Sequence, residues 1–328
     1  MALRNHSTIT EFILLGLSAD PKVQILLFVL FMGIYLLTMM GNLMLLLVIR
    51  ADSHLHTPMY FLLSHLSFLD LCFSSVTVPK LLENLLSKKK IISKEDCLTQ
   101  AFFVFDIGGT EIFLLSVMAY DRYAAICYPL LYIQVISSQL CVKLVWASWG
   151  LGFLDAVINI PLSMNLNFCE NHIIPHYTCE LPSLFHLSCS DISTDVTVLT
   201  GSTLLHGFGT FFLIFFSYTR IVSTILSISS TTGRSKAFST CSSHLTAVSF
   251  FYVSAFLRYL MPTSGMLRYL MPPSGSSLDL LSSLQYSVIT PMLNPLIYSL
   301  RNKEVKTAVK RTLGKYSQYF GHPWWTGS

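Results

Sequence analysis

The sequence of 328 residues contains few charged side chains. Only 12% of its residues are Asp, Glu, Lys or Arg, whereas 52% are hydrophobic and the mean hydropathy is +0.59. In typical soluble domains about a quarter of the residues are charged, because charged side chains cover much of the surface. The scarcity of charge excludes an ordinary soluble enzyme, and the high hydrophobic content excludes a disordered chain. An integral membrane protein remains.

An excess of charge of one sign is also missing. The 21 basic and 17 acidic residues give a formal net charge of +4. This excess is too small to indicate binding to nucleic acid, so we expect no nucleic-acid partner. The positions of the basic residues are therefore more informative than their number.

Long runs with few or no charged residues indicate the architecture. A helix needs about 20 mostly apolar residues to cross the hydrocarbon core of a bilayer. A β-barrel is not indicated, because its strands would be shorter and would alternate strictly. The sequence therefore predicts an all-α integral membrane protein, a seven-transmembrane helix bundle. The predicted spans lie in the runs 23–49, 54–79, 98–120, 144–168, 196–219, 237–257 and 280–300.

The orientation of the chain follows from its ends and its basic residues. Asn5 begins the only N-x-S/T sequon, which predicts glycosylation and an N-terminus outside the cell. With seven spans the C-terminus is then inside, and twelve of the 21 Lys and Arg residues fall on the inner side, in agreement with the positive-inside rule. We expect a multi-pass protein of the plasma membrane with an extracellular segment 1–22, a seven-transmembrane domain 23–300 and a cytoplasmic tail 301–328.

The start of the tail has the pattern of a short amphipathic helix on the inner membrane surface. Apolar residues recur there every three to four positions, and basic residues lie between them. A soluble charged tail is the alternative. The apolar positions are Val305, Ala308, Val309 and Leu313, and the basic ones are Lys303, Lys306, Lys310 and Arg311.

Four of the eight cysteines fall in segments that we place outside the cell. An even number of cysteines in an oxidising compartment favours two disulfides. Zinc binding with His172, His176 and His186 is the alternative, but no closely spaced cysteine pair supports it. The four outer cysteines are Cys97, Cys169, Cys179 and Cys189.

Acidic residues within the predicted spans are candidates for function, because a charge in the middle of a membrane is costly. Asp70 lies in the second span and Glu111 in the third. As a pair they are suited to share a cation or a proton, and a structural, hydrogen-bonded carboxylate is the alternative. Asp106 and Asp155 also lie at membrane depth, without a clear role from the sequence.

Several motifs occur together in this chain. They are MAYDRYAAICYPL at 118–130, PMLNPLIYSLRN at 291–302, GN at 41–42, LHTPMYF at 55–61 and KAFSTCSSHL at 236–245. Together they resemble those of rhodopsin-like G-protein-coupled receptors, and specifically those of the olfactory receptors. The resemblance extends from Asn5 to about Lys315. DRY and NPxxY alone are typical of the whole superfamily, whereas the longer segments are typical of the olfactory branch.

This resemblance implies a set of functional residues at the inner half. The first group would change contacts on activation and couple to a G protein: Asp121, Arg122, Tyr123, Tyr218, Asn294, Pro295 and Tyr298. The second would hold a sodium ion: Asp70, Glu111, Asn42 and Asn294. For a receptor of this kind we predict the disulfides Cys97–Cys179 and Cys169–Cys189. We expect no other cofactor or metal.

Receptors of this family bind small ligands in the outer half of the bundle, where a pocket should be mostly apolar. The adjacent Gly108 and Gly109 should leave local space, and Asp106 should point elsewhere. The absence of Lys and Arg from the predicted set favours a neutral, volatile, moderately apolar odorant. The set comprises Val104, Phe105, Gly108, Gly109, Ser202, Thr203, His206, Tyr252, Ala255, Tyr259 and Ser287.

One segment departs from the family pattern. Residues 257–266, LRYLMPTSGM, are nearly repeated as LRYLMPPSGS at 267–276, in the third outer loop. Two copies of ten residues cannot form a solenoid, and a surface loop tolerates such an insertion. The copy of Tyr259 at Tyr269 is an alternative pocket residue. The ending Trp324–Trp325 has no interpretation.

The sequence thus predicts an odorant receptor that activates a stimulatory olfactory-type G protein, raises cyclic AMP and contacts membrane lipid. A receptor of the same fold for a non-odorant metabolite is an alternative that tissue expression would separate. A transporter or channel is disfavoured, because inverted repeats of hydropathy and paired broken helices are missing from the sequence. An enzyme is least favoured, because the polar residues do not form a nucleophile, base and orienting group.

Overall fold

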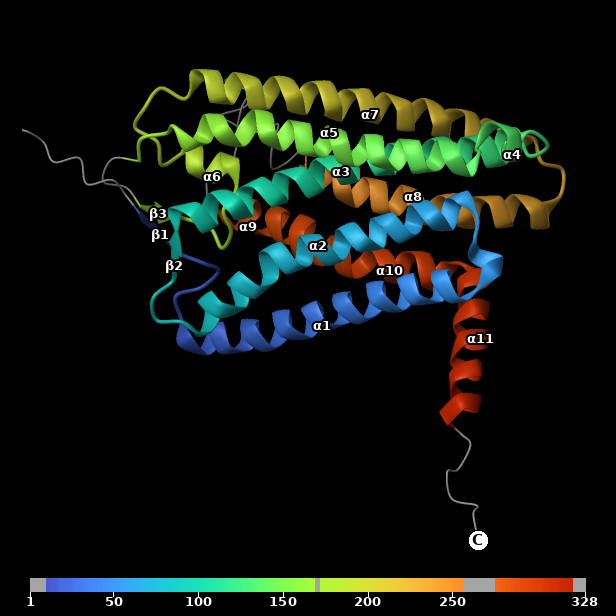
Figure 1. The fold of residues 1–328 in the computed structure, drawn as a ribbon, viewed down its shortest axis with the longest axis horizontal. Coiled ribbons are helices and arrows are strands. Elements are labelled where there is room, and N and C mark those ends of the chain that lie inside the picture. Colours follow the sequence, from blue (N-terminus) through green and yellow to red (C-terminus); the bar gives the residue numbers. More distant parts are fainter. Residues whose placement is uncertain (1–9, 169–171, 256–274, 321–328) are drawn as a thin grey trace, which may run out of the picture.

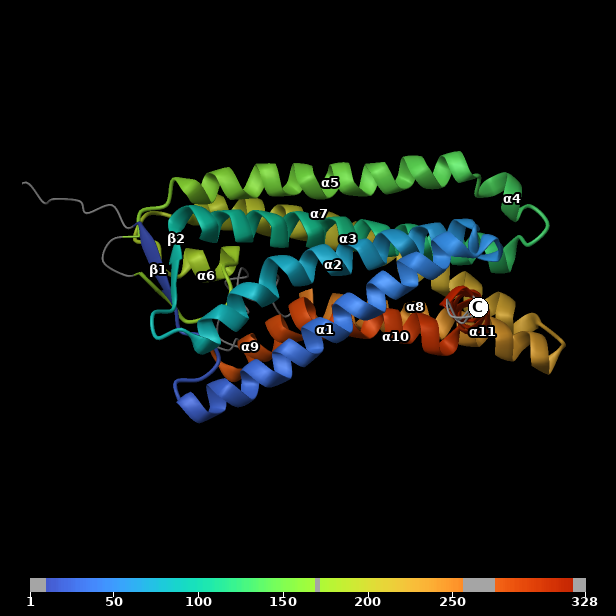
Figure 2. The ribbon, with the colours of Figure 1, turned by 60° about the horizontal axis from the view of Figure 1, so that its bottom comes forward.

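The computed structural model describes residues 10–168, 172–255 and 275–320. Long helices lie side by side along one axis (Figure 1). Three short strands lie at one end of this bundle, and the last helix runs away from the other end (Figures 1 and 2). We call these the strand end and the α11 end. The elements that define them are β1 (Glu11–Leu14), β2 (Ile91–Ser93), β3 (Ile173–Ile174) and α11 (Lys303–Phe320).

Each of the seven predicted runs contains a helix, and the described residues 56–57 and 165–168 of these runs lie outside helices. Among the described helices, α1, α2, α3, α5 and α7 are each long and apolar enough to cross a membrane. The helical bundle predicted from the charge-poor runs is thus confirmed. The helices are α1 (Pro21–Ala51), α2 (Pro58–Leu86), α3 (Lys94–Cys127), α5 (Ser138–Met164), α7 (Ser193–Ser227), α8 (Thr231–Ala255) and, for the seventh span, α9 (Ser277–Leu284), the π-helical turn η3 (Gln285–Ile289) and α10 (Thr290–Arg301).

The helix starts have local signals in the sequence. Asp20 precedes Pro21 and accepts a hydrogen bond from the backbone N–H of Lys22 at 2.8 Å. Ser93 caps α3 in the same way by accepting from the backbone N–H of Asp96 at 3.0 Å. These caps satisfy backbone donors that have no partner within the helix. Short helical turns join some of the long helices: η1 (Ser53–Leu55), α4 (Tyr132–Val135) and α6 (Leu181–Phe185).

The helix α3 is the central element of the bundle. It packs against α2, α5, α7 and α8. In its most apolar stretch 67% of the residues are buried, compared with 11% in α1. Side chains of α3 therefore point toward several other helices, and this position explains why polar residues on α3 meet partners from so many of them.

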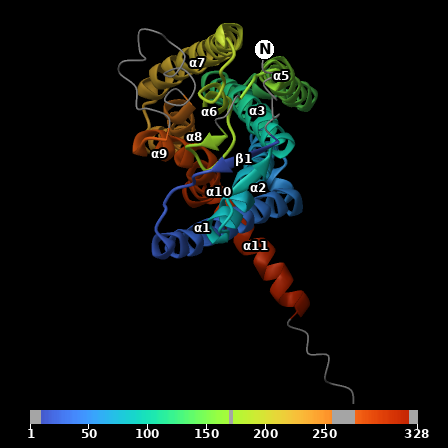
Figure 3. The same cartoon turned by 90° about the vertical axis from the view of Figure 1, so that its left-hand side faces the viewer.

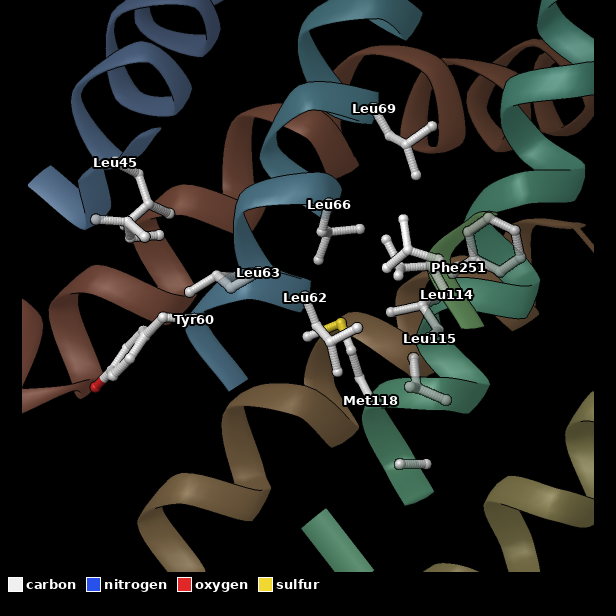
Figure 4. Close-up of a cluster of buried hydrophobic side chains, with 14 of the residues drawn as sticks. Leu45, Tyr60, Leu62, Leu63, Leu66, Leu69, Leu114, Leu115, Met118 and Phe251 are labelled. Atoms are coloured by element: carbon white, nitrogen blue, oxygen red, sulfur yellow. The ribbon is translucent and has the colours of Figure 1, made fainter. Parts of the chain in front are cut away.

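A cluster of large aliphatic side chains fills the bundle toward the α11 end (Figure 4). Because lipid is as apolar as these side chains, their close packing rather than their removal from water holds the helices together. Side chains on the outer faces of the bundle, such as Leu26, Trp146 and Leu205, are exposed. The cluster includes Leu45, Leu62, Leu63, Leu66 and Leu69 of α1 and α2, Leu114, Leu115 and Met118 of α3, and Phe251 of α8.

The strand end carries a small sheet that the sequence did not predict. Its order is β2-β1-β3, with β1 antiparallel to β2 and parallel to β3. Phe12 and Leu14 of β1 are fully buried, and Phe12 packs edge-on against Phe168. In Figure 3 the strand β1 and the helix α6 lie in front of the long helices. The segment before α1 thus covers the end of the bundle.

The proline within α10 is compensated by a side chain of α1. Pro295 has no backbone N–H, so the carbonyl oxygen of Pro291 loses its helical partner. Asn42 Nδ2 donates a hydrogen bond to this oxygen at 3.1 Å. A Cβ atom added to Gly41 would lie only 3.2 Å from Cγ of Pro295. Glycine therefore permits the close approach of α1 and α10, and the adjacent asparagine satisfies the carbonyl that the proline leaves free.

The predicted amphipathic helix is present as α11. Val305 and Ala308 are fully buried, whereas Lys306 and Lys310 are exposed. This alternation has the helical spacing that the sequence indicated. The side chains of Lys303 and Leu313 lie outside the described part of the structure.

Candidate functional site

A cavity of about 450 Å³ lies among α3, α5, α7, α8 and η3. Its lining residues on α3, from Val104 to Ile112, lie mostly in the half of that helix nearer its start at the strand end. The volume is suited to a small organic molecule. Aromatic and aliphatic side chains make up most of its wall, among them Phe105, Ile112, Phe208, Phe211, Phe251 and Val253.

Most of the predicted ligand residues line this cavity, but two do not. Ser202 instead accepts a hydrogen bond from Asn159 Nδ2 at 3.2 Å, and the Ser287 hydroxyl lies 2.8 Å from the hydroxyl of Tyr177. Tyr259 lies outside the described residues. The predicted residues in the wall are Val104, Phe105, Gly108, Gly109, Thr203, His206, Tyr252 and Ala255.

Both predicted glycines line the cavity, but the position that a side chain would take at each of them is already occupied. A Cβ atom added to Gly108 would collide with the hydroxyl group of Tyr286. One added to Gly109 would lie 3.2 Å from Cα of Gly152 on α5. The glycines therefore allow a tyrosine and a helix backbone to approach α3 closely. The spacing of residues along one helix could not reveal what fills the space beside it.

The cavity wall also contains a polar pair that the sequence analysis missed. His206 of α7 and Asp155 of α5 both line the cavity, and His206 Nδ1 lies 2.8 Å from Asp155 Oδ2. Asp155 is buried, and its Oδ1 has no hydrogen-bond partner among the described residues. The signal that was available is that Asp155 is the one charged residue in the run 144–168. Asp106, as expected, does not belong to the cavity wall.

Three of the predicted ion-site residues, Asp70, Glu111 and Asn294, interact within the bundle, and Asn42 contacts α10 through the carbonyl oxygen of Pro291. Asn294 Nδ2 donates to both carboxylate oxygens of Asp70, at 3.0 and 3.2 Å. Glu111 is buried and interacts electrostatically with Asp70. The amide oxygens of Asn42 and Asn294 are buried and have no hydrogen-bond partner within the described residues. Carboxylate and amide oxygens are the donors that a hard cation prefers, so this donor set fits such an ion.

The arginine of the DRY motif is held at the α11 end. Arg122 Nη2 lies 3.4 Å from Asp121 Oδ2, and both residues are buried. The Tyr132 hydroxyl of α4 donates to the other oxygen of Asp121 at 2.7 Å. Tyr123 does not join this group, since its hydroxyl donates to that of Tyr128 at 3.3 Å. Asp121 thus has two partners, and loss of the hydrogen bond from Tyr132 would change how firmly Asp121 holds Arg122.

Tyr218 of α7 is linked to α8 and α3 through a histidine that sequence reasoning did not single out. The Tyr218 hydroxyl lies 2.7 Å from His244 Nδ1, and His244 Nε2 lies 3.1 Å from the carbonyl oxygen of Leu115. Because a carbonyl oxygen accepts, Nε2 carries the hydrogen, and in a neutral ring Nδ1 then accepts from Tyr218. His244 lies within the KAFSTCSSHL segment, so the motif contained the signal. Tyr298 is near the same end, and its hydroxyl has no partner among the described residues.

A disulfide ties the strand end together. Cys97 of α3 and Cys179 are bonded, which confirms this predicted pair. Gln100 Oε1 also accepts a hydrogen bond from the backbone N–H of Cys179 at 2.8 Å. Cys189 is disulfide-bonded too, whereas its predicted partner Cys169 lies outside the described residues. Within the described residues no group of three His, Cys, Asp or Glu side chains is placed to hold a metal ion, so the zinc alternative gains no support.

The helix α11 is fastened to the turn between α1 and α2. Arg311 Nη2 lies 2.9 Å from Asp52 Oδ2. Desolvation opposes the ionisation of Asp52, but hydrogen bonds from His54 and the charge of Arg311 hold the pKa of Asp52 below its usual value. Tyr60, from the LHTPMYF motif, donates to Glu304 Oε2 at 2.8 Å. The motif therefore has a structural role in docking α11.

Some predicted features lie outside the described residues. They are the glycosylation site Asn5, most of the repeated loop 257–276 and the Trp324–Trp325 ending. The last residues of the repeat are described: Gly275 has a φ of +82°, and a Cβ atom there would lie 2.6 Å from the carbonyl oxygen of Pro175. Ser276 follows as the cap of α9.

Known proteins resemble this chain along nearly its whole length. A family model described as olfactory receptor matches residues 31–316. "Olfactory receptor 8S1" of Homo sapiens is 68% identical over 93% of this chain and 82% of its own length. "Olfactory receptor 1E16" of Mus musculus is 47% identical over 96% of this chain and 98% of its own length. Squid rhodopsin has a similar structure, with a TM-score of 0.68 and 19% identity over 92% of this chain and 88% of that one. This likeness confirms the seven-transmembrane helical fold.

Proposed function

The chain belongs to the olfactory receptor family, whose members are signalling receptors of the membrane and not enzymes, and we propose that it detects a small volatile odorant. The odorant binds in the cavity of the strand-end half. Binding rearranges the helices, and the α11 end then activates a stimulatory, olfactory-type G protein that raises cyclic AMP.

The cavity is the observation that carries this proposal. Its volume of about 450 Å³ suits a small molecule, and most of its wall is apolar. Among the described residues that line the cavity there is no Lys or Arg, and this favours a neutral ligand. Apolar contacts with the aromatic side chains of Phe105, Phe208 and Phe251 supply most of the affinity.

The groups at the α11 end support G-protein coupling. Asp121 holds Arg122 while itself accepting a hydrogen bond from Tyr132. A helix movement that separates these groups frees the guanidinium, and such a pair is suited to act as a two-state switch. Tyr218 and Tyr298 lie on two other spans near the same end and are placed to stabilise the rearranged state. Pro295 lowers the number of backbone hydrogen bonds that resist a movement of α10.

We infer the orientation from the same two ends. The disulfide Cys97–Cys179 lies at the strand end, and disulfides persist in oxidising compartments outside the cytoplasm. The exposed Lys306 and Lys310 of α11 favour the inner, negatively charged membrane surface. We therefore propose a protein of the plasma membrane with its N-terminus outside, its C-terminus inside and lipid around its exposed apolar faces.

We propose that a sodium ion binds between Asp70 and Glu111. The buried amide oxygens of Asn42 and Asn294, together with the carboxylates, supply oxygen donors. Bound there, a cation would supply the positive charge that offsets two buried acids, which are otherwise costly. The ion would favour the arrangement in which Asn294 holds Asp70.

A cyclic AMP reporter assay in cells tests the proposed function. We expect some members of a broad panel of volatile compounds to raise cyclic AMP in cells that display the receptor on their surface. The variant Ala255→Trp should remove the response by filling the cavity, while Leu205→Trp, on an exposed face of α7, should keep it. A receptor that reaches the surface and responds to no compound, or an Ala255→Trp variant with an unchanged response, contradicts the proposal.

A further inference from the structure

The pair formed by His206 and Asp155 lies in a largely apolar wall, whose other polar side chains carry only hydroxyl groups. His206 Nδ1 and Asp155 Oδ2 are 2.8 Å apart, and the side chains are 24% and 8% exposed. The ring of His206 also packs edge-on against Phe113 of α3, with ring centres 5.2 Å apart. Two contacts thus fix the orientation of the imidazole, one through Nδ1 and one through the ring.

The two helices that carry the pair are held close to their neighbours. Gly152 lies one turn before Asp155 on α5, and a Cβ atom there would lie 2.6 Å from the carbonyl oxygen of Asp106 on α3. One turn after Asp155, Asn159 Nδ2 donates to the hydroxyl of Ser202 on α7 at 3.2 Å. Glycine on one side and an interhelical hydrogen bond on the other therefore fix where Asp155 meets α7.

Two hydroxyl groups near the pair, those of Thr210 and Tyr252, are already engaged in hydrogen bonds. The Thr210 hydroxyl donates to the backbone carbonyl of His206 at 2.6 Å, and the Tyr252 hydroxyl donates to Thr210 Oγ1 at 2.7 Å. His206 uses Nδ1 for Asp155, and within the described residues Nε2 forms no hydrogen bond. Since His206 lines the cavity, Nε2 is the nitrogen that remains for a ligand.

The charge of the pair determines whether Nε2 of His206 carries a hydrogen that it can donate to a ligand. A net charge in a mostly apolar cavity is costly, and neither Lys nor Arg is present in the described wall to balance a carboxylate. Three states have no net charge. In two of them, an imidazolium beside a carboxylate and a neutral imidazole that accepts at Nδ1 from the carboxyl O–H of Asp155, Nε2 carries a hydrogen. In the third, a neutral imidazole donates Nδ1–H to the carbonyl oxygen of a protonated Asp155, and the carboxyl O–H at Oδ1 is then buried without a partner among the described residues, which is costly. The remaining state, a neutral ring that donates Nδ1–H to a carboxylate, leaves one negative charge unbalanced, with Asp155 Oδ1 buried and unpaired.

We propose, on the premise that odorants bind in this cavity, that His206 selects ligands with a neutral hydrogen-bond acceptor, and that these are carbonyl compounds such as ketones, aldehydes and esters. The carbonyl oxygen accepts from Nε2–H, and the hydrocarbon part contacts the aromatic wall. Asp155 acts as a positioning residue that keeps the hydrogen on Nε2. A carboxylate ligand is disfavoured because it would add a negative charge that the pair cannot neutralise.

An amine is the main alternative to a carbonyl compound as the ligand of this pair. An ammonium group would balance an ionised Asp155 and leave His206 neutral. It would have to reach the buried Oδ1, because Oδ2 is already held by His206. His206 is the more exposed member of the pair, at 24% compared with 8% for Asp155, which favours contact with its donor over contact with the carboxylate.

The test uses the full-length receptor and three compounds of matched carbon skeleton: a ketone, the corresponding alkane and the corresponding primary amine. Binding is measured as the ligand-induced shift in melting temperature of the purified receptor, and signalling as cyclic AMP in cells. The proposal expects the ketone to be about ten- to a hundredfold more potent than the alkane, the range of one buried hydrogen bond. His206→Leu should remove that ratio, and His206→Gln, which keeps an N–H donor, should restore part of it.

Three further variants separate selection by this pair from general damage. Asp155→Asn keeps a donor for Nδ1 and should keep the preference for the ketone, whereas Asp155→Leu should weaken it. Thr203→Val, also in the wall and on the same helix, should shift the potency of ketone and alkane alike and leave their ratio unchanged.

The outcomes distinguish this inference from the proposed function. An amine that is the most potent compound, or a ketone-to-alkane ratio that His206→Leu leaves unchanged, overturns the inference while odorant binding stands. Binding of the ketone without cyclic AMP supports the inference and contradicts the proposed coupling. A surface-displayed receptor that neither binds nor responds to any compound overturns both.

Discussion

The two halves of the bundle are built from the same helices but are filled differently. In the strand-end half, Gly109 and Gly152 bring the backbones of α3 and α5 together beside a cavity of about 450 Å³, and Gly108 admits the hydroxyl of Tyr286. In the α11-end half, large side chains such as Leu114 and Met118 fill the space among α2, α3 and α8 (Figure 4). One half is thus open to a ligand, and the other is packed.

The difference explains how each half is stabilised. A half that must leave space cannot rely on packing alone, and the strand end is held by the disulfide Cys97–Cys179 and the β2-β1-β3 sheet. The packed half is held by its aliphatic cluster and carries the polar contacts of Arg122 and His244. We infer that the open half determines which ligand binds and that the packed half converts binding into a helix movement.

The largest effect on signalling is expected from a substitution of Arg122, in the proposed switch of the packed half. Arg122→Ala should abolish the cyclic AMP response to odorants, because it removes the group that Asp121 holds and that the proposed switch requires. Receptor on the cell surface should still be present, and Arg220→Ala, an exposed arginine of α7, serves as the matched control. Normal signalling by Arg122→Ala at equal surface density would contradict the role assigned to this residue.

Removal of the disulfide should affect the open half most. Cys97→Ser should destabilise the receptor by about 2–5 kcal/mol, as loss of a native disulfide typically does, and should reduce the amount at the cell surface. Flow cytometry of an N-terminal tag measures that amount. Cys127→Ser, a free cysteine of α3, should leave it near normal. Equal surface levels for both variants would contradict the role of the disulfide.

A cavity created in the packed half should cost stability without changing selectivity. Leu114 is buried, and Leu114→Ala should lower the free energy of unfolding by about 2–5 kcal/mol. The melting temperature of the purified receptor should fall accordingly, while the order of ligand potencies stays the same. Leu205→Ala, on an exposed face, should change the melting temperature little. A changed order of potencies in Leu114→Ala would show that the two halves are not separate.

The smallest effect is expected at the contact between α11 and the turn after α1. Arg311→Ala removes a partially exposed ion pair with Asp52, and such pairs contribute little. We expect a decrease in cyclic AMP potency of no more than about fivefold. Lys310→Ala, the exposed neighbour, should have no measurable effect. Loss of all signalling in Arg311→Ala would place α11 within the switch itself.

Much of this structure could be predicted because its signals are local. Runs with few or no charges predict membrane helices, and the three- to four-residue spacing after Arg301 predicts α11. The adjacent Asp121 and Arg122 of the DRY motif are in contact, whereas the motifs did not reveal Tyr132 and His244 as partners at this end. Most of the predicted cavity residues also line the cavity.

The features that were missed depend on contacts between distant segments. The sheet joins β1 to strands from two other parts of the chain, and no periodicity in one segment reveals its partner. The space beside Gly108 is filled by Tyr286, which comes from η3. Asp155 gains its role only because α5 and α7 bring it to His206. In each case the sequence shows one partner, and the fold supplies the other.

A structure of the receptor with an activating odorant tests the central claim most directly. The account predicts that the odorant lies in the cavity among α3, α7, α8 and η3, with a hydrogen-bond acceptor within about 3 Å of Nε2 of His206, the usual length of such a bond. An odorant bound outside this cavity, or bound in it with His206 turned away and Asp155 alone in contact, would contradict the account.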